Sequence, residues 1–89
     1  MRQNQRMNDD RMAADYKPIS CASYEQYEIA IMHKQKMRLA WHENNVLFDQ
    51  IVTPLNLRAT QGREFLILRT AEGETRELRL DHIRRAETL

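Results

Sequence analysis

The stretch MRLAWHENNVLFDQIVT, residues 37–53, decides the fold of the chain. Its first part alternates apolar residues with polar or small ones, as in a strand with one buried face, and the apolar set is Met37, Leu39 and Trp41. The pair Asn44-Asn45 follows, and because asparagine tolerates a positive φ, this pair predicts a tight hairpin turn. We therefore expect two antiparallel strands here, the second running from residue 46 to about residue 53.

The sequence after this hairpin predicts further strands. Pro54 has no N–H to donate, so we expect it to break or bulge the second strand. Residues 64–70 carry apolar side chains on both faces, which indicates a central strand or a barrel strand. A turn at residues 71–73 leads into TRELRLDHI, residues 75–83, whose alternation predicts a fourth strand. The final letters, RRAETL, predict a fraying end.

Ahead of the first strand the pattern is helical. Residues 16–19 predict an extended lead-in, because their proline disfavours helical backbone angles. A helix is expected to begin at Ser20 or Ser23 and to end near His33, and Ser23 with Gln26 fits the spacing of a capping box. Apolar residues then recur every three or four positions, and the predicted buried face consists of Tyr24, Tyr27, Ile29, Ala30 and Ile31.

One helix followed by four or five antiparallel strands predicts a mainly β protein. So few strands do not make an open sandwich, whereas strongly bent strands can close into a small barrel without unpaired edges. We therefore expect a small, strongly bent antiparallel β-barrel that is capped by the helix. A chain of 89 residues has room for one domain, which we place at residues 16–84, between a disordered leader at residues 1–15 and a flexible C-terminus at residues 85–89.

The composition excludes several classes of protein. No run approaches the roughly 18 apolar residues of a membrane span, and the start MRQNQRMNDD lacks the apolar segment of a secretory signal. We therefore expect a cytoplasmic protein that does not bind membranes. The single Cys21 cannot form an intramolecular disulfide or a cysteine-based metal site.

Catalytic chemistry finds little support in the sequence. The three histidines, His33, His42 and His82, are far apart, and no nucleophile or acid–base partner stands near them in a recognised spacing. Both glycines lie where turns are expected, so there is no glycine-rich phosphate loop. We expect a protein that is not an enzyme and that uses no cofactor, no metal and no small-molecule substrate.

The charge balance bears on nucleic-acid binding, which is common among small barrels. Residues 16–83 contain nine basic and nine acidic residues, whereas a nucleic-acid binder usually has a basic excess. Trp41 is in a core-facing position, and we expect it to pack there rather than to stack on a base. Direct binding of single-stranded RNA remains the alternative function if folding gathers the basic residues into one patch, namely Lys34, Lys36, Arg38, Arg58 and Arg63.

The expected helix has one distinctive face. Glu25 and Glu28 stand beside the aromatic residues Tyr24 and Tyr27. Carboxylates next to aromatic rings on a rigid helix suit docking onto a basic surface of a partner protein.

Two strings carry a resemblance to a known family. YKPISCASYEQYEIAIMHK, residues 16–34, and EFLILRTAEGETRELRLDHI, residues 64–83, resemble the Rof family of Rho-binding antiterminators, also called YaeO. The most specific pieces are Tyr-x-Pro-Ile-x-Cys at residues 16–21 and GETRELRLD at residues 73–81. The resemblance covers residues 16–83 and implies an Sm-like (SH3-like) barrel with an N-terminal helix.

The resemblance also implies a function. Members of this family bind the hexameric termination factor Rho at the primary RNA-binding site of its N-terminal OB domain, and so antagonise Rho-dependent termination without catalysing a reaction. The helix is their main docking element. We expect the protein to be a monomer. The residues that we expect to bind Rho are Tyr24, Glu25, Glu28, Gln61, Gly62 and Arg63.

The chain also departs from the family pattern. Glu25 stands where relatives usually have an aspartate, which preserves the charge on a longer side chain. Ala22 and Ser23 stand where some relatives carry an acidic pair, and the loop at residues 60–63 is less basic than in some relatives. We therefore expect the affinity for Rho to differ from that of other members.

Overall fold

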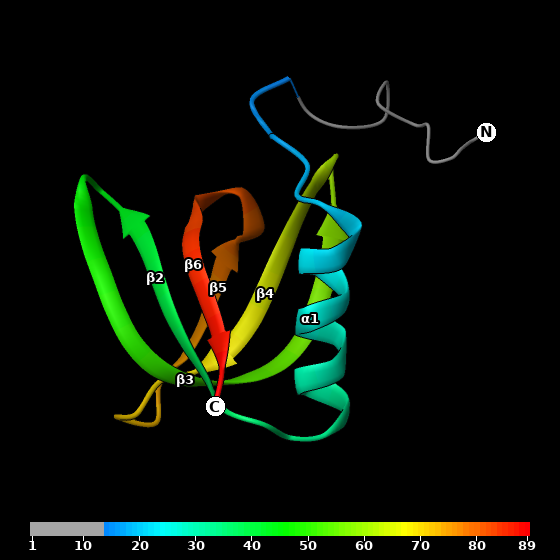
Figure 1. The fold of residues 1–89 in the computed structure, drawn as a ribbon. Coiled ribbons are helices and arrows are strands. Elements are labelled where there is room, and N and C mark those ends of the chain that lie inside the picture. The colour runs from blue at the N-terminus through cyan, green and yellow to red at the C-terminus, as the bar shows by residue number, and fades with distance from the viewer. Residues whose placement is uncertain (1–13) are drawn as a thin grey trace.

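The computed structural model describes residues 14–89, so all but the last two residues of the predicted leader lie outside the described range. Residues 14–89 form one helix, five strands and a short 3-10 turn (Figure 1). Their bounds are α1 (Cys21–Met32), β2 (Met37–Glu43), β3 (Val46–Thr60), β4 (Arg63–Arg69), β5 (Thr75–Arg79), η2 (Leu80–His82) and β6 (Ile83–Thr88). All strand pairs are antiparallel, and the strand order is β5-β4-β3-β2-β6.

Strand β3 lies at the centre of this order, and its two halves pair with different neighbours. Its first half, from Val46 to Val52, pairs with β2, and its second half, from Thr53 to Thr60, pairs with β4. The register shifts between Pro54 and Asn56, so the bulge predicted at the proline is present. The strand continues past it to Thr60 rather than ending near Thr53, because a bulge absorbs the missing N–H without ending the pairing.

The sheet is strongly bent, as Figure 1 shows, but it is not closed. The expected mainly β fold with one N-terminal helix is confirmed, whereas a barrel slightly overstates it, because no backbone pairing joins β5 to β6 within residues 14–89. Side chains bridge part of the opening instead. The guanidinium of Arg76 on β5 donates to the carboxylate of Glu43 at the end of β2 and lies 5.8 Å from the centre of the Phe48 ring.

The C-terminal letters RRAETL, for which a fraying end was expected, instead belong largely to strand β6. This strand pairs with β2, with a bulge between Ala40 and Trp41. The side-chain amide of Gln26 in α1 donates to the Ala86 carbonyl oxygen at 3.3 Å and to Thr88 Oγ1 at 3.4 Å. The sequence pattern misses β6 because an edge strand is held by backbone pairing and needs no alternation of apolar residues.

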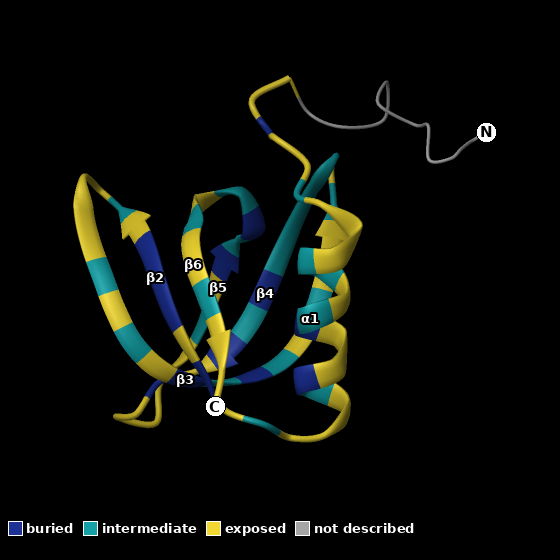
Figure 2. Cartoon of the chain, viewed as in Figure 1, coloured by how far each residue is buried: buried dark blue, intermediate teal, exposed yellow. Residues whose placement is uncertain are grey.

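The core lies between the bent sheet and the inner side of α1, and its residues are dark blue in Figure 2. Met37, Leu39 and Trp41 of β2 are buried as predicted, and Trp41 is only 1% exposed. The small residue Ala40 between them is buried too, so the alternation is interrupted at the bulge. The rings of Trp41 and Phe48 are stacked with centroids 5.4 Å apart, so Trp41 packs in the core as expected. The other buried core residues are Tyr27, Ala30, Met37, Leu39, Val52, Leu66, Leu68, Leu78 and Leu80.

The helix buries a narrower face than its periodicity predicts. Tyr27 and Ala30 are buried, and Tyr24 and Ile31 lie against the core, but Ile29 is 45% exposed. Ile29 is therefore a wrong prediction. A helix that touches a sheet along a single stripe leaves the flanking apolar positions in solvent.

Ser20 is the residue that caps α1. Its side-chain oxygen accepts a hydrogen bond from the Ser23 N–H at 3.1 Å, and its φ and ψ angles are extended. The alternative start at Ser23 is therefore wrong, and Gln26 does not complete a capping box because its amide is bound to β6. At the other end, His33 is the C-cap.

Replacing the cap tests this assignment. Ser20→Ala removes the acceptor for an otherwise unpaired helix N–H, and we expect it to lower the free energy of unfolding by about 1 kcal/mol. Ser23→Ala keeps its backbone N–H and serves as the matched control with a smaller effect. Urea denaturation followed by circular dichroism measures both, and a larger loss in Ser23→Ala would contradict the assignment.

Candidate functional site

An open surface groove of about 520 Å³ lies where the N-terminal part of α1 meets the start of β4. We call it the acidic groove. Its lining residues are Pro18, Ile19, Cys21, Ala22, Tyr24, Glu25, Glu28 and Glu64. The predicted helix residues Tyr24, Glu25 and Glu28 thus lie together in one groove, and β4 contributes a further carboxylate.

The carboxylates of the groove differ from most of the other carboxylates in residues 14–89. Elsewhere, arginines form ion pairs with Asp15, Glu43, Asp49, Glu77 and Asp81. Within the described range, no ion pair involves Glu25, Glu28 or Glu64. The groove therefore presents three carboxylates that form no ion pair with a described side chain.

Tyr24 lies among these carboxylates with its ring half-buried against the core. Burial raises the pKa of its phenol, and the nearby negative charges of Glu64 and Glu28 raise it further. The hydroxyl is therefore protonated at neutral pH. An aromatic ring next to carboxylates is suited to a cationic group, which gains from both the ring face and the charges.

Glu64 was not among the predicted site residues. It is the second residue of β4, and the Tyr16 hydroxyl donates a hydrogen bond to its Oε1 at 2.9 Å. The sequence did contain an indication of this residue. Glu64 lies on the same face of its strand as Leu66 and Leu68, which are fully buried. A carboxylate in register with core residues at a strand end is unusual, and it indicates a residue at the rim of the core.

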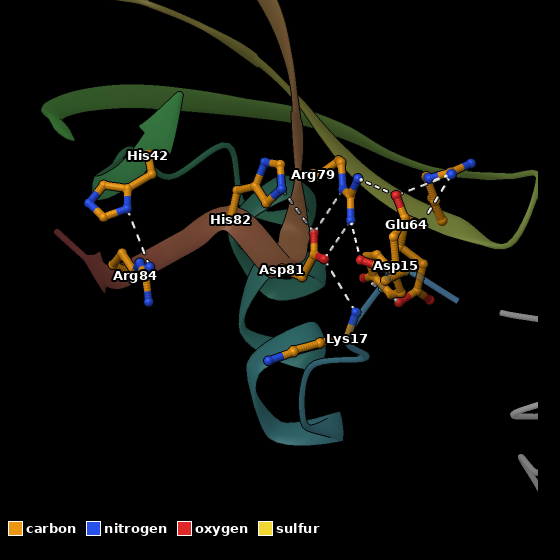
Figure 3. A network of polar contacts seen from close by, with 10 residues as sticks. Asp15, Lys17, His42, Glu64, Arg79, Asp81, His82 and Arg84 are labelled. Atoms are coloured by element: carbon orange, nitrogen blue, oxygen red, sulfur yellow. Dashed lines mark hydrogen bonds and ion pairs between the residues drawn. The ribbon is translucent and has the colours of Figure 1, made fainter. Parts of the chain in front are cut away.

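The N-terminal arm, residues 15–19, is held by a polar network that also fixes the start of the helix (Figure 3). Arg79 donates to both carboxylate oxygens of Asp81, at 3.0 and 2.7 Å, and to the Asp15 carbonyl at 2.9 Å. Asp81 also accepts the backbone N–H of Lys17 at 3.2 Å. Tyr16 is buried, and the Arg79 guanidinium lies 5.8 Å from the centre of its ring.

Asp81 is the most buried carboxylate of this network, with a side chain that is 7% exposed. Burial alone would raise its pKa, but hydrogen bonds from Arg79 and from the Lys17 N–H favour the ionised form and hold the pKa below its ordinary value. The two motifs that carried the family resemblance, at residues 16–21 and 73–81, thus contact each other directly in the fold.

The predicted residues of the β3–β4 turn lie beside the groove and do not line it. Gln61 and Gly62 both have positive φ angles, 52° and 75°, as a tight two-residue turn requires. Arg63 points to Asp15, with a closest distance of 3.1 Å between its Nη2 and a carboxylate oxygen. The turn adjoins the groove through Glu64, the next residue along β4.

Folding separates the arginines of the alternative RNA-binding patch. Arg38 lies on β2 and pairs with Asp49 at 2.9 Å, whereas Arg58 lies on the half of β3 that pairs with β4 and contacts Glu77 at 2.6 Å. Arg63 is bound to Asp15. The arginines of this set therefore sit on different parts of the sheet, each with an acidic partner.

The histidines do not form a site in the range that the structure covers. His42 Nδ1 lies 3.3 Å from Arg84 Nη2, and His82 Nε2 lies 3.9 Å from Asp81. Among residues 14–89, no group of three or more His, Cys, Asp or Glu side chains is arranged to hold a metal ion. In the same range, no helix has the length and apolar character needed to cross a membrane.

Fold and groove together define a class: a small protein built on a bent antiparallel sheet, with an acidic groove beside its single helix. Residues 18–89 match the family model described as modulator of Rho-dependent transcription termination (ROF). The proteins named Protein rof from Escherichia coli strain K12 and from Shigella flexneri are each 35% identical over 68 residues, which covers 76% of this chain and 76% of each relative. The chain belongs to the Rof family, whose members modulate Rho-dependent transcription termination.

A solved structure shares the fold. Proteasome accessory factor B/C (PafBC) of Arthrobacter aurescens matches 81% of this chain with a TM-score of 0.69, at 17% sequence identity. The match covers 12% of that protein. At this identity the likeness concerns the fold alone.

The position of Tyr24 can be tested by its titration. Glu64→Gln and Glu28→Gln each remove a negative charge that disfavours the phenolate, so we expect both to lower the pKa of Tyr24, the first more than the second. NMR of the tyrosine ring at alkaline pH measures this pKa. Tyr27, whose pKa burial raises to about 12, is an internal control that stays unchanged. An unaltered Tyr24 pKa in both variants would contradict the geometry of the groove.

The network that holds the N-terminal arm makes the free energy of unfolding depend on pH in the acid range, which we call the acid limb. Because its folded-state pKa is depressed, Asp81 contributes stability that is present above its unfolded pKa and is lost as the pH falls below about 4. We expect Asp81→Asn to lower the free energy of unfolding at pH 7 by about 2 kcal/mol and to flatten this acid limb. Asp49→Asn, in an exposed ion pair, is the control with a smaller loss, and urea titrations from pH 2 to 7 test both. Equal losses in the two variants would contradict the prediction.

Proposed function

We propose that the protein binds the termination factor Rho through the helix side of the acidic groove. In this proposal it occludes the primary RNA-binding site on the N-terminal OB domain of Rho, and so antagonises Rho-dependent termination. The observation that carries the proposal is the unneutralised carboxylate pair of α1, Glu25 and Glu28, beside the ring of Tyr24, in a chain of the Rof family.

The chemistry of RNA recognition supports this choice of target. A surface that binds RNA must offer cationic groups to the phosphates and flat surfaces to the bases. Carboxylates and an aromatic ring match such a surface in charge and in shape, so the protein and RNA compete for the same groups. Tyr24 provides the ring, and Glu25 and Glu28 provide the charges.

The turn residues Gln61, Gly62 and Arg63 form the second contact of the proposed interface. They follow β3 and stand next to the groove, so a partner that fills the groove meets them at its rim. Arg63 is bound to Asp15 and is thereby held in place rather than free to sample solvent. Polar groups at the rim of an interface fix how the two partners are aligned more than they raise the affinity.

The protein acts in this proposal as a cytoplasmic monomer and a binding protein, with no reaction catalysed. Since the charges of residues 16–83 balance, attraction to Rho depends on the local charge of the groove and not on the net charge of the molecule. Binding is therefore expected to weaken as salt is added.

Competition for RNA is the direct test. A labelled pyrimidine-rich single-stranded oligonucleotide is bound to Rho, and its fluorescence anisotropy is followed as this protein is added. We expect the anisotropy to fall toward that of free oligonucleotide. A parallel titration without Rho stays flat in this proposal, whereas a rise there would show that the protein itself binds RNA.

A charge reversal locates the interface. The double variant Glu25→Lys and Glu28→Lys is expected to lose competition, because it places cations opposite the basic groups of Rho. The matched control is Glu72→Lys and Glu74→Lys, which makes the same change on the exposed β4–β5 turn at the other end of β4. Loss of competition in the control alone, or unchanged competition in the helix variant with its fold intact, would refute the assignment of the helix.

A further inference from the structure

We propose that Glu64 is a further Rho-binding residue, that Tyr16 is the residue that positions it, and that the groove between Glu64 and α1 receives one cationic side chain of Rho against the ring of Tyr24. This inference rests on the proposed function and assigns a role to two residues outside the helix and the turn. It also names the group that the groove takes: the guanidinium of an arginine or the ammonium of a lysine.

The geometry of Glu64 favours a fixed carboxylate. The Tyr16 hydroxyl donates to Oε1 at 2.9 Å, and Tyr16 itself is 4% exposed, so the donor cannot swing away. Burial and the hydrogen bond to Glu64 raise the pKa of the Tyr16 phenol, which keeps the donated proton on the tyrosine. Glu25 and Glu28 stand on the exposed side of a helix and have no such holder among the described residues. Glu64 is therefore the preorganised carboxylate of the groove.

Preorganisation decides how much a charged contact contributes. A side chain that is already fixed loses little conformational freedom when a partner binds, so more of its interaction energy appears as affinity. Because Tyr16 occupies Oε1 and no ion pair of residues 14–89 engages this carboxylate, its charge is available to an incoming cation.

The rest of the groove fits a long basic side chain. Arginine and lysine have an apolar stem and a charged head, and they bury the stem along apolar surface while the head meets polar groups. The groove offers apolar walls from Pro18, Ile19 and Ala22, and it offers the carboxylates of Glu28 and Glu64, whose charges both act on Tyr24. A cation placed there lies near an aromatic ring and two negative charges at once.

Four variants of the full chain test the proposal with the oligonucleotide competition assay on Rho. They are Glu64→Gln, Tyr16→Phe, the double variant that combines both, and the control Glu72→Gln. Glutamine keeps the shape of glutamate and removes its charge, and phenylalanine keeps the ring over Arg79 and removes the hydroxyl. We expect Glu64→Gln to weaken binding about tenfold and to reduce its salt dependence, and Glu72→Gln to leave both unchanged.

The double variant separates positioning from structure. If Tyr16 acts through Glu64, Tyr16→Phe weakens binding about threefold when residue 64 is glutamate and has a much smaller effect when it is glutamine. A purely structural role of Tyr16 gives the same loss in both backgrounds, which would overturn its positioning role. Thermal unfolding of each variant is measured alongside, and Tyr16→Phe provides a second reading at this site if Glu64→Gln does not fold.

The outcomes distinguish this inference from the proposed function. If Glu64→Gln competes as well as Glu72→Gln while the charge-reversed helix variant has lost competition, the role of Glu64 is refuted and the helix interface stands. If the unmodified protein does not displace the oligonucleotide from Rho, both proposals fall together.

Discussion

Strand β3 has to pair with β2 along its first half and with β4 along its second, and the positions of the other elements follow from this division. The sheet bends where the pairing changes, and the bulge at Pro54 allows the strand to continue through the bend. The bend turns β4 toward the side of the sheet on which α1 packs against β3. It therefore places Glu64, near the start of β4, in the same groove as the first turns of the helix. The groove is therefore a consequence of the division of β3 between its two pairing partners, β2 and β4.

The N-terminal arm fixes where the helix begins relative to that sheet. Arg79 and Asp81, at the end of β5 and in η2, bind Asp15 and the backbone of Lys17, while Tyr16 reaches Glu64 on β4. These contacts span many residues of sequence, so they form only when the sheet is complete. Since the arm continues directly into α1, the network sets the helix start against the rim of the core. One set of polar contacts thus orients both walls of the groove.

The local parts of the fold were predictable, and the parts that depend on long-range contacts were not. The hairpin at residues 37–53 follows from alternation and from a pair of asparagines, both of which act within a few residues. The exposure of Ile29 and the existence of β6 depend on what lies opposite them, which periodicity does not encode. Closure of the sheet into a barrel is not encoded locally either. Whether the edge strands β5 and β6 meet depends on the lengths and the bending of all five strands. Within the groove, the helix residues were predictable as one face, but Glu64 joins them only through folding.

The distribution of ion pairs explains how a chain with balanced charges can present an acidic surface. Several arginines on the sheet are matched to carboxylates near them, such as Arg38 with Asp49 and Arg58 with Glu77. Exposed pairs of this kind add little stability, so their main consequence is that these cations are occupied. The acids of α1 form no ion pair with a described residue, so their charge is open to a partner, although salt screens it beyond roughly 8 Å. An attraction of this range acts only when the two surfaces are already close, so selectivity also needs a matching shape around the charges. A ring set in a groove provides more of that shape than a flat acidic patch.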